Sequence, residues 1–224
     1  MNWMKKVAVA LVCLLPLGLQ AAKVDTLQVK SPSMNKSIEV VVVSPDVAAT
    51  KACPVIYLLH GYGGNARTWV GIKPDLPKIA DEKGIFFVCP DGKNTWYWDS
   101  PLNADVRYET FISDELVKYV DSHYKTVADR KGRAITGLSM GGHGAMWNGL
   151  RHSDVFSAAG STSGGVDIRP FPKNWEMSVQ IGEKAKYPEN WEKYTVINLV
   201  PTLRKDQIAL IFDCGDSDFF LEVN

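Results

Sequence analysis

The chain has 224 residues, of which 46% are hydrophobic and 22% are charged, and 25 lysines and arginines balance 25 aspartates and glutamates. This length and composition fit one globular domain with a sizeable core, and they exclude a disordered or fibrous chain. The balanced charge gives no reason to expect a nucleic-acid partner.

The first residues are typical of a secretory signal peptide. Lys5 and Lys6 precede an apolar stretch at residues 7–19, and Gln20-Ala21-Ala22 supplies small residues for cleavage. The apolar stretch is too short to span a bilayer comfortably. The sequence therefore predicts a signal peptide at residues 1–22, a mature domain at residues 23–224, a secreted or periplasmic location, and no stable membrane insertion after cleavage.

Two antiparallel strands are expected at residues 24–30 and 37–44, joined through a Ser-Pro-Ser turn. Further along the chain, mostly apolar runs are typical of strands buried on both faces. These runs lie at residues 55–59, 85–89, 133–138, 156–162 and 208–212. Helical patterns separate them, and the clearest covers about residues 106–123. The alternation predicts an α/β fold with a mostly parallel central sheet and helices on both faces.

The segment at residues 164–204 differs from the rest of the chain. It is rich in proline, tryptophan and lysine, is weakly periodic, and lies between two predicted core strands. An insertion at this point should sit over the carboxyl edge of the sheet, where ligands bind in such folds. It is either a lid over the substrate or a surface excursion without a role in binding.

Three cysteines, Cys53, Cys89 and Cys214, follow the predicted signal peptide. We expect buried thiols, with a bridge between Cys89 and Cys214 as the alternative. Neither a C-x-x-C motif nor a cluster of histidine and cysteine is present, so no metal site is predicted.

The sequence Gly137-Leu138-Ser139-Met140-Gly141 carries the strongest functional signal. It lies between a predicted strand and a predicted helix at residues 142–150, which is the setting of a G-x-S-x-G nucleophile elbow. The turn is so tight that the residues two before and two after the serine must be nearly free of side chain. Ser139 is therefore the predicted nucleophile, and the alternative is a glycine-rich turn with an idle serine.

An attacking serine needs two donors for the oxyanion that forms on the substrate. The first is the backbone N–H of Met140, which follows the nucleophile at the start of a helix. The second should come from the glycine-rich loop at residues 60–64, where we select the N–H of Tyr62. The same loop, with Asp91 after the next strand, also fits a dinucleotide-binding fingerprint, but this alternative leaves the serine elbow unexplained.

The orienting acid should follow a late strand. Asp213, Asp216 and Asp218 all lie at the end of the last predicted strand. Asp213 belongs to the strand end and Asp216 to an exposed turn, whereas Asp218 follows the turn and can point back towards the serine. Asp218 is therefore preferred, with Asp167, after the preceding strand, as the alternative.

Three motifs together resemble the esterase D family of α/β-hydrolases. They are His-Gly-Tyr-Gly-Gly at residues 60–64, Gly-Leu-Ser-Met-Gly-Gly-His-Gly at 137–144, and Asp-Cys-Gly-Asp-Ser-Asp-Phe-Phe at 213–220. The family includes S-formylglutathione hydrolases, tributyrin esterases, feruloyl and acetyl-xylan esterases, and mycolyltransferases. The resemblance covers about residues 35–224 and implies an α/β-hydrolase fold without a cofactor. It also implies Ser139 as nucleophile, Tyr62 and Met140 as oxyanion donors, and Asp218 as acid.

The histidines depart from the family pattern. The family's catalytic histidine lies some tens of residues beyond the acid, on a loop after one further strand. Here the sequence ends at Asn224, and all four histidines precede Asp218. We therefore expect a fragment that lacks the final strand and helix, with a natural pseudoenzyme as the alternative. His60 and His143 are expected to be structural, and His123 and His152 to be solvated.

Aromatic residues give a weaker indication of the substrate. Trp96 and Trp98 follow a predicted strand at the functional edge, where they could stack on a feruloyl ring or on a sugar. The alternative is that they fill the interior of a long loop. The sequence thus predicts a secreted serine esterase for small-molecule or carbohydrate esters with short acyl, acetyl or hydroxycinnamoyl groups. An acyltransferase of the mycolyltransferase type and a non-catalytic carbohydrate-binding protein remain open.

Overall fold

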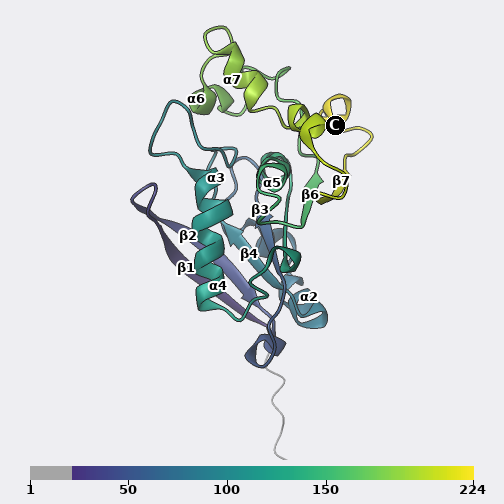
Figure 1. The fold of residues 1–224 in the computed structure, drawn as a ribbon. Coiled ribbons are helices and arrows are strands. Elements are labelled where there is room, and N and C mark those ends of the chain that lie inside the picture. Colours follow the sequence, from purple (N-terminus) through teal and green to yellow (C-terminus); the bar gives the residue numbers. More distant parts are fainter. Residues whose placement is uncertain (1–21) are drawn as a thin grey trace, which may run out of the picture.

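The computed structural model describes residues 22–224, so the predicted signal peptide, apart from Ala22, lies outside the described residues. A seven-stranded sheet forms the centre of the molecule, with the strand order β1-β2-β4-β3-β5-β6-β7 (Figure 1). The strands are β1 (Lys23–Ser31), β2 (Lys36–Ser44), β3 (Val55–Leu59), β4 (Phe86–Pro90), β5 (Arg133–Gly137), β6 (Ala158–Thr162) and β7 (Ala209–Asp213). β1 and β2 pair antiparallel, as do β2 and β4, and all later pairs are parallel. The predicted α/β fold with a mostly parallel sheet is therefore confirmed.

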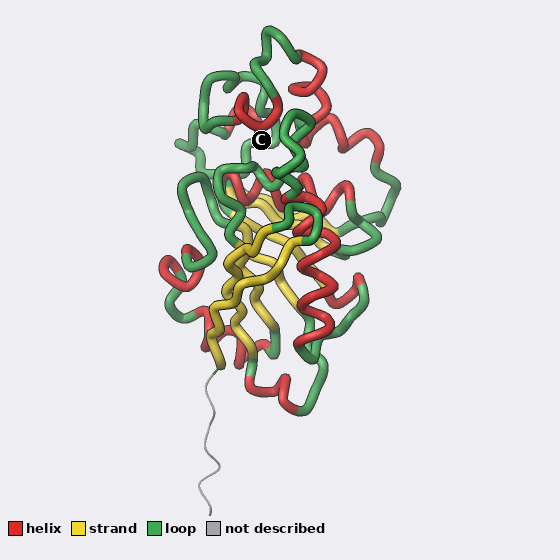
Figure 2. The backbone as a smooth tube through the Cα atoms, turned by 90° about the vertical axis from the view of Figure 1, so that its left-hand side faces the viewer, coloured by secondary structure: helices red, strands yellow, loops and turns green. Residues whose placement is uncertain are grey.

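Strands β2, β3 and β4 are buried on both faces because they carry almost continuous apolar runs. In β2, Val40 and Val42 face the larger apolar cluster, whereas Val41 and Val43 face a second cluster on the other side. Adjacent residues of a strand point to opposite faces, so each cluster takes every second side chain. Figure 2 shows the twisted strands with helices outside them.

Helices cover the two faces unequally. The bounds are α1 (Thr68–Ile72), α2 (Leu76–Lys83), α3 (Tyr108–Thr110), α4 (Leu116–His123), α5 (Met140–Arg151), α6 (Met177–Ile181) and α7 (Pro188–Lys193). α2 covers the smaller cluster, while α4 and α5 belong to the larger one. The helix predicted at residues 106–123 consists of α3, one π-helical turn at Phe111–Glu115 and α4.

The segment at residues 164–204 contains α6, α7 and a 3-10 helix at Val196–Thr202, and it lies beyond one end of the sheet (Figure 1). It is attached to the loop after β4, since Trp96 Nε1 donates a 3.0 Å hydrogen bond to the Trp175 carbonyl. Met177, Ile181 and Trp191 are fully buried against the main core. The insertion is therefore a packed layer over the loops that follow the parallel strands.

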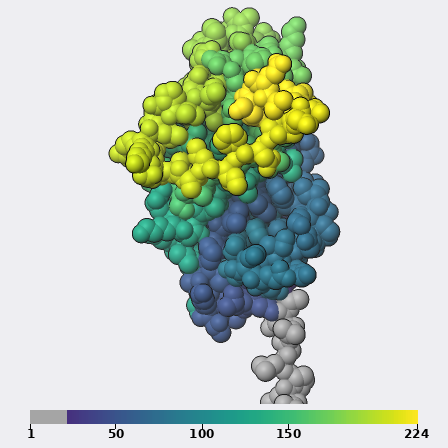
Figure 3. Space-filling view, turned by 90° about the vertical axis from the view of Figure 1, so that its right-hand side faces the viewer, coloured from purple at the N-terminus to yellow at the C-terminus, as the bar shows by residue number. Residues whose placement is uncertain are grey.

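β7 is an edge strand whose five residues are all exposed. Ile211 and Phe212 are 75% and 61% exposed, which is unusual for apolar strand residues. Figure 3 shows the C-terminal residues spread over this face of the molecule. Among the described residues, β7 is thus an exposed and largely apolar edge of the sheet.

The three described cysteines are free thiols. Cys53 and Cys89 are buried as predicted, whereas Cys214 is half-buried, and the alternative Cys89–Cys214 bridge is absent. Between residues 22 and 224, no helix has the length and apolar character needed to cross a membrane.

Candidate active site

Ser139 occupies a strained turn between β5 and α5. Its φ of 52° and ψ of −121° lie in a region of backbone conformation that residues other than glycine rarely adopt. The turn is held from both sides, because Ser139 N donates to the Thr162 carbonyl at 2.9 Å and Gly141 N donates to the Leu138 carbonyl at 2.8 Å. The side chain is half-buried and not enclosed. These features are those of a nucleophile elbow.

The two glycines of the elbow are required by close backbone contacts. A Cβ atom at Gly141 would lie 2.5 Å from the Leu59 carbonyl carbon and 2.6 Å from the His60 carbonyl oxygen. A Cβ atom at Gly137 would lie 2.7 Å from the Leu59 carbonyl oxygen. The elbow therefore rests directly on the end of β3, and any larger residue would displace it.

The glycine-rich loop after β3 packs against the elbow. A Cβ atom at Gly61 would be only 3.5 Å from Ser139 Cβ and 2.8 Å from Leu138 Cδ1. This contact places Gly61, the residue before Tyr62, next to the serine. Met140 is the first residue of α5, where a backbone N–H has no partner within the helix and lies at the positive end of its dipole. Met140 thus directly follows the predicted nucleophile, and Tyr62 directly follows the glycine that contacts it.

Asp218 follows β7, two strands away from the elbow in the sheet. Its Oδ1 accepts a 2.8 Å hydrogen bond from Phe220 N, which fixes the carboxylate at the turn. The alternative acid, Asp167, is bound by the guanidinium of Arg169 at 2.8 Å through both carboxylate oxygens. Those hydrogen bonds hold the pKa of Asp167 below its ordinary value. Asp167 is therefore engaged, and Asp218 is the better candidate.

Two of the four histidines are buried in the core. His60 Nε2 accepts from Gly92 N at 2.9 Å, and His143 Nε2 accepts from Trp98 Nε1 at 3.2 Å. Burial lowers the pKa of His143 to about 4. Both side chains are buried and hydrogen-bonded, as expected of structural residues, and neither imidazole forms a hydrogen bond with Ser139.

The other two histidines lie away from the elbow. His123 Nδ1 hydrogen-bonds the Tyr119 carbonyl at 2.8 Å on the exposed end of α4. His152 was expected to be solvated, but this prediction is wrong, because its Nε2 donates to the buried carboxylate of Glu109 at 2.8 Å. All four imidazoles therefore have partners elsewhere, and the position of the general base beside Ser139 is not filled from residues 22–224.

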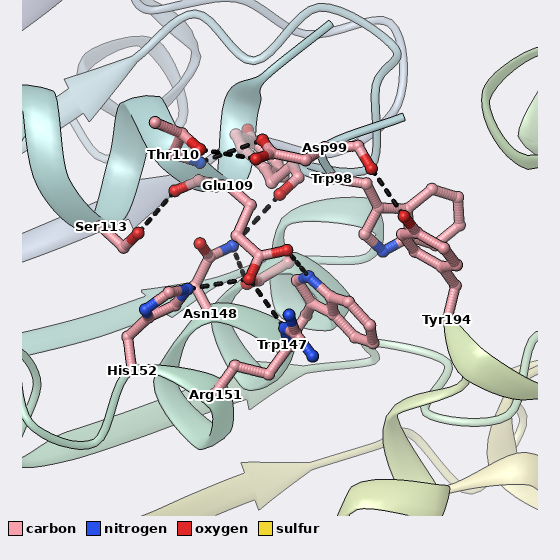
Figure 4. A network of polar contacts seen from close by, with 12 residues as sticks. Trp98, Asp99, Glu109, Thr110, Ser113, Trp147, Asn148, Arg151, His152 and Tyr194 are labelled. Atoms are coloured by element: carbon pink, nitrogen blue, oxygen red, sulfur yellow. Dashed lines mark hydrogen bonds and ion pairs between the residues drawn. The ribbon is translucent and has the colours of Figure 1, made fainter. Parts of the chain in front are cut away.

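The Glu109 carboxylate joins α3 to α5 in a network that sequence reasoning missed (Figure 4). Besides His152, it accepts hydrogen bonds from Trp147 Nε1 at 2.8 Å and from Arg151 Nε at 2.7 Å. Burial would raise the pKa of Glu109, but the hydrogen bonds from His152, Arg151 and Trp147 hold it below its ordinary value. A glutamate in an apolar helical pattern was the only available signal.

Trp96 and Trp98 do not form the substrate surface that the sequence suggested. Their side chains are 1% and 0% exposed. Their rings stack on each other with centroids 5.6 Å apart, and both pack edge-on against His143. The prediction of substrate contact is therefore wrong, because the loop after β4 folds inward beneath residues 164–204.

Two further features of this region concern metal ions and nucleotides. Within residues 22–224, no three side chains among histidine, cysteine, aspartate and glutamate gather as metal ligands would. In the alternative dinucleotide interpretation Asp91 would bind a ribose, but its carboxylate is 2.6 Å from Lys93 Nζ and is buried beside His60. The elbow, by contrast, matches acyl-transfer chemistry.

Comparison with known proteins agrees with this chemistry. The model of the Esterase family, whose description is "Putative esterase", matches residues 31–224. The chain belongs to this family. The resemblance to esterases of the α/β-hydrolase fold that the three motifs indicated is therefore confirmed.

Two curated relatives and one solved structure illustrate the similarity. Esterase Rv1288 of Mycobacterium tuberculosis is 30% identical over 149 residues, which are 63% of this chain but only 32% of that protein. The acetyl esterase of Caldicellulosiruptor saccharolyticus is 31% identical over 187 residues, covering 75% of this chain and 67% of that enzyme. A ferulic acid esterase structure superposes with a TM-score of 0.72 at 30% identity, covering 91% of this chain and 82% of that one. The chain thus spans about a third of the length of the mycobacterial esterase.

Proposed function

We propose that this esterase acts through an acyl-serine intermediate on Ser139. The observation that carries the proposal is the strained φ of 52° at Ser139, in a turn held against the glycine-rich loop after β3. In this mechanism Ser139 Oγ attacks the ester carbonyl, and the resulting oxyanion is bound by the N–H groups of Met140 and Tyr62. Asp218 orients the histidine that acts as base.

The base is the part of the mechanism that the described residues do not supply. A serine without a general base keeps only the contributions of the oxyanion hole and of binding, with losses on the order of 10⁴–10⁶ in kcat. The proposal therefore requires an imidazole beside Ser139 that is none of the four described ones. If no such imidazole is available, a non-catalytic protein that binds carbohydrate is the competing function.

We further propose that the substrates are acetyl, short-chain acyl or hydroxycinnamoyl esters of small molecules or carbohydrates, and that the protein is exported. Two similar proteins, an acetyl esterase and a ferulic acid esterase, support these acyl groups. The lysines and apolar stretch before residue 22 support export to the periplasm or the medium.

Labelling with a fluorophosphonate probe tests the proposal. The full-length gene product is treated with the probe, and the modified peptide is identified by mass spectrometry. We expect Ser139 to be labelled, no labelling of the Ser139→Ala variant, and hydrolysis of p-nitrophenyl butyrate or methyl ferulate. Absence of labelling together with intact binding of xylan oligosaccharides would refute the hydrolase and favour the binding protein.

A further inference from the structure

We propose that His60 is a positioning residue for the oxyanion hole: its imidazole fixes the peptide plane that carries the Tyr62 N–H. This inference rests on the proposed function. It arises from the hydrogen bonds of a buried histidine that the acid–base chemistry does not use.

The tautomer of His60 follows from its neighbours. The ring is 1% exposed, and Gly92 N donates a 2.9 Å hydrogen bond to Nε2, so Nε2 carries a lone pair. In a neutral imidazole the proton is then on Nδ1. Nδ1 lies 2.8 Å from the Gly61 carbonyl oxygen, to which it donates.

The bond to the Gly61 carbonyl acts on the oxyanion donor directly. The C=O of Gly61 and the N–H of Tyr62 belong to one planar peptide group and point in opposite directions. Holding the oxygen therefore fixes the direction of the N–H. Gly64 N donates to the same oxygen at 3.0 Å, so the carbonyl has two donors. Hydrogen bonds of this kind polarise one another, which strengthens the N–H as a donor.

The imidazole is itself rigidly held. The hydroxyl of Tyr97 donates to the His60 carbonyl at 3.0 Å, and the Tyr97 ring packs against the imidazole with centroids 5.7 Å apart. The bond from Gly92 ties the ring to the loop after β4. His60 thus connects the loop after β4 to the peptide group that adjoins Ser139, at the point where a Cβ on Gly61 would lie 3.5 Å from Ser139 Cβ.

Two substitutions separate the two hydrogen bonds of the ring. In His60→Asn the side-chain amide nitrogen can take the position of Nδ1 and donate to Gly61, while the bond from Gly92 is lost. In His60→Gln the amide oxygen can take the position of Nε2 and accept from Gly92, while the bond to Gly61 is lost. Each variant gives up one buried hydrogen bond, so both should lose stability to a similar extent.

Kinetics of p-nitrophenyl butyrate hydrolysis by the complete gene product then test the role. Loss of an oxyanion donor costs about 10²–10³ in kcat, so a misdirected one should cost about 10–100-fold. We expect that loss in His60→Gln with KM within about twofold, and kcat within about fivefold of the parent in His60→Asn. His123→Gln, on the exposed end of α4, is the control and should change neither constant. Equal kcat losses in the Asn and Gln variants, or retained kcat in His60→Gln, would overturn the inference.

The outcomes also distinguish this inference from the proposed function. If the parent protein is not labelled at Ser139, the proposed function fails. If the parent turns over and the two variants do not differ, only the role of His60 fails. Should His60→Gln not fold, ¹H–¹⁵N NMR of the parent reads the tautomer instead. A proton on Nδ1 supports the role, whereas a proton on Nε2 overturns it.

Discussion

Replacing Gly141 by alanine tests whether the elbow is fixed by backbone contact. The added Cβ would lie 2.5 Å from the Leu59 carbonyl carbon and 2.6 Å from the His60 carbonyl oxygen. Overpacking typically costs about 1–3 kcal/mol. Here the added Cβ would meet main-chain atoms at the end of β3. Because β3 is paired with β4 on one side and with β5 on the other, these atoms cannot move without disturbing the sheet. We expect the free energy of unfolding to fall by about 3 kcal/mol, which is a large part of the about 5–15 kcal/mol that stabilises a typical domain.

Urea denaturation followed by circular dichroism measures this loss. The urea concentration at the transition midpoint should fall, while the m-value, the slope of the free energy of unfolding against urea concentration, stays the same. Gly71→Ala is the matched control, because Gly71 lies in α1 and a Cβ there has no neighbour within 4 Å. That substitution should leave stability unchanged or raise it by up to about 1 kcal/mol. A free energy of unfolding for Gly141→Ala within about 0.5 kcal/mol of the parent would contradict the close contact.

Three further predictions concern strain and buried charge. Ser139→Gly should raise the melting temperature, because relief of strain of about 1–3 kcal/mol exceeds the added freedom of the unfolded chain, while fluorophosphonate labelling is lost. The pKa of His143 is lowered to about 4 in the folded protein, so as pH falls the unfolded chain takes up the His143 proton first. The free energy of unfolding should therefore decrease as pH drops from about 6.5 to 4, by up to about 1.4 kcal/mol per pH unit. His143→Gln, whose side chain can still accept the hydrogen bond from Trp98, should flatten this slope in denaturation measured at several pH values. The pKa of Glu109 is also lowered in the folded protein, so its contribution to the free energy of unfolding is present above its unfolded pKa and is lost as pH falls through the folded pKa. Glu109→Gln should lower the free energy of unfolding at pH 7 by about 1–3 kcal/mol and remove this dependence on acid pH. An unchanged pH profile in the variant would count against the network.

The sheet could be predicted from sequence because its signal is local. The run at residues 55–59 is apolar at every position, and β3 occupies the same five residues, Val55–Leu59. Residues 164–204 could not be predicted in the same way. Their buried side chains, such as Trp191, do not follow one helical period, since α6 and α7 are short and separated by turns. Only long-range packing decides which of these residues face the core.

The same distinction applies to the site. Gly137, Ser139 and Gly141 form the elbow within five residues, so sequence alone indicates it. Trp96 and Trp98 were misassigned because an aromatic residue in a loop gives no signal of the direction it faces. They are buried because residues 164–204, which lie far along the chain, pack over them. The hydrogen bond from His60 to Gly61 is local in sequence, but the tautomer that gives it direction is set by Gly92, 32 residues away.

His143 is the histidine closest in sequence to Ser139, and its surroundings explain why it cannot be the missing base. A general base works best with a pKa near the operating pH, whereas burial lowers the pKa of His143 to about 4. Its Nε2 lone pair is occupied by Trp98 Nε1, and its Nδ1 donates to the Gly165 carbonyl at 3.1 Å. Freeing the ring would leave both buried partners unsatisfied, at about 1–3 kcal/mol each, before any proton is transferred. Imidazole added in solution should therefore accelerate acylation of Ser139 in the 224-residue chain equally in the parent and in His143→Gln, and a slower response in the variant would show that His143 takes part.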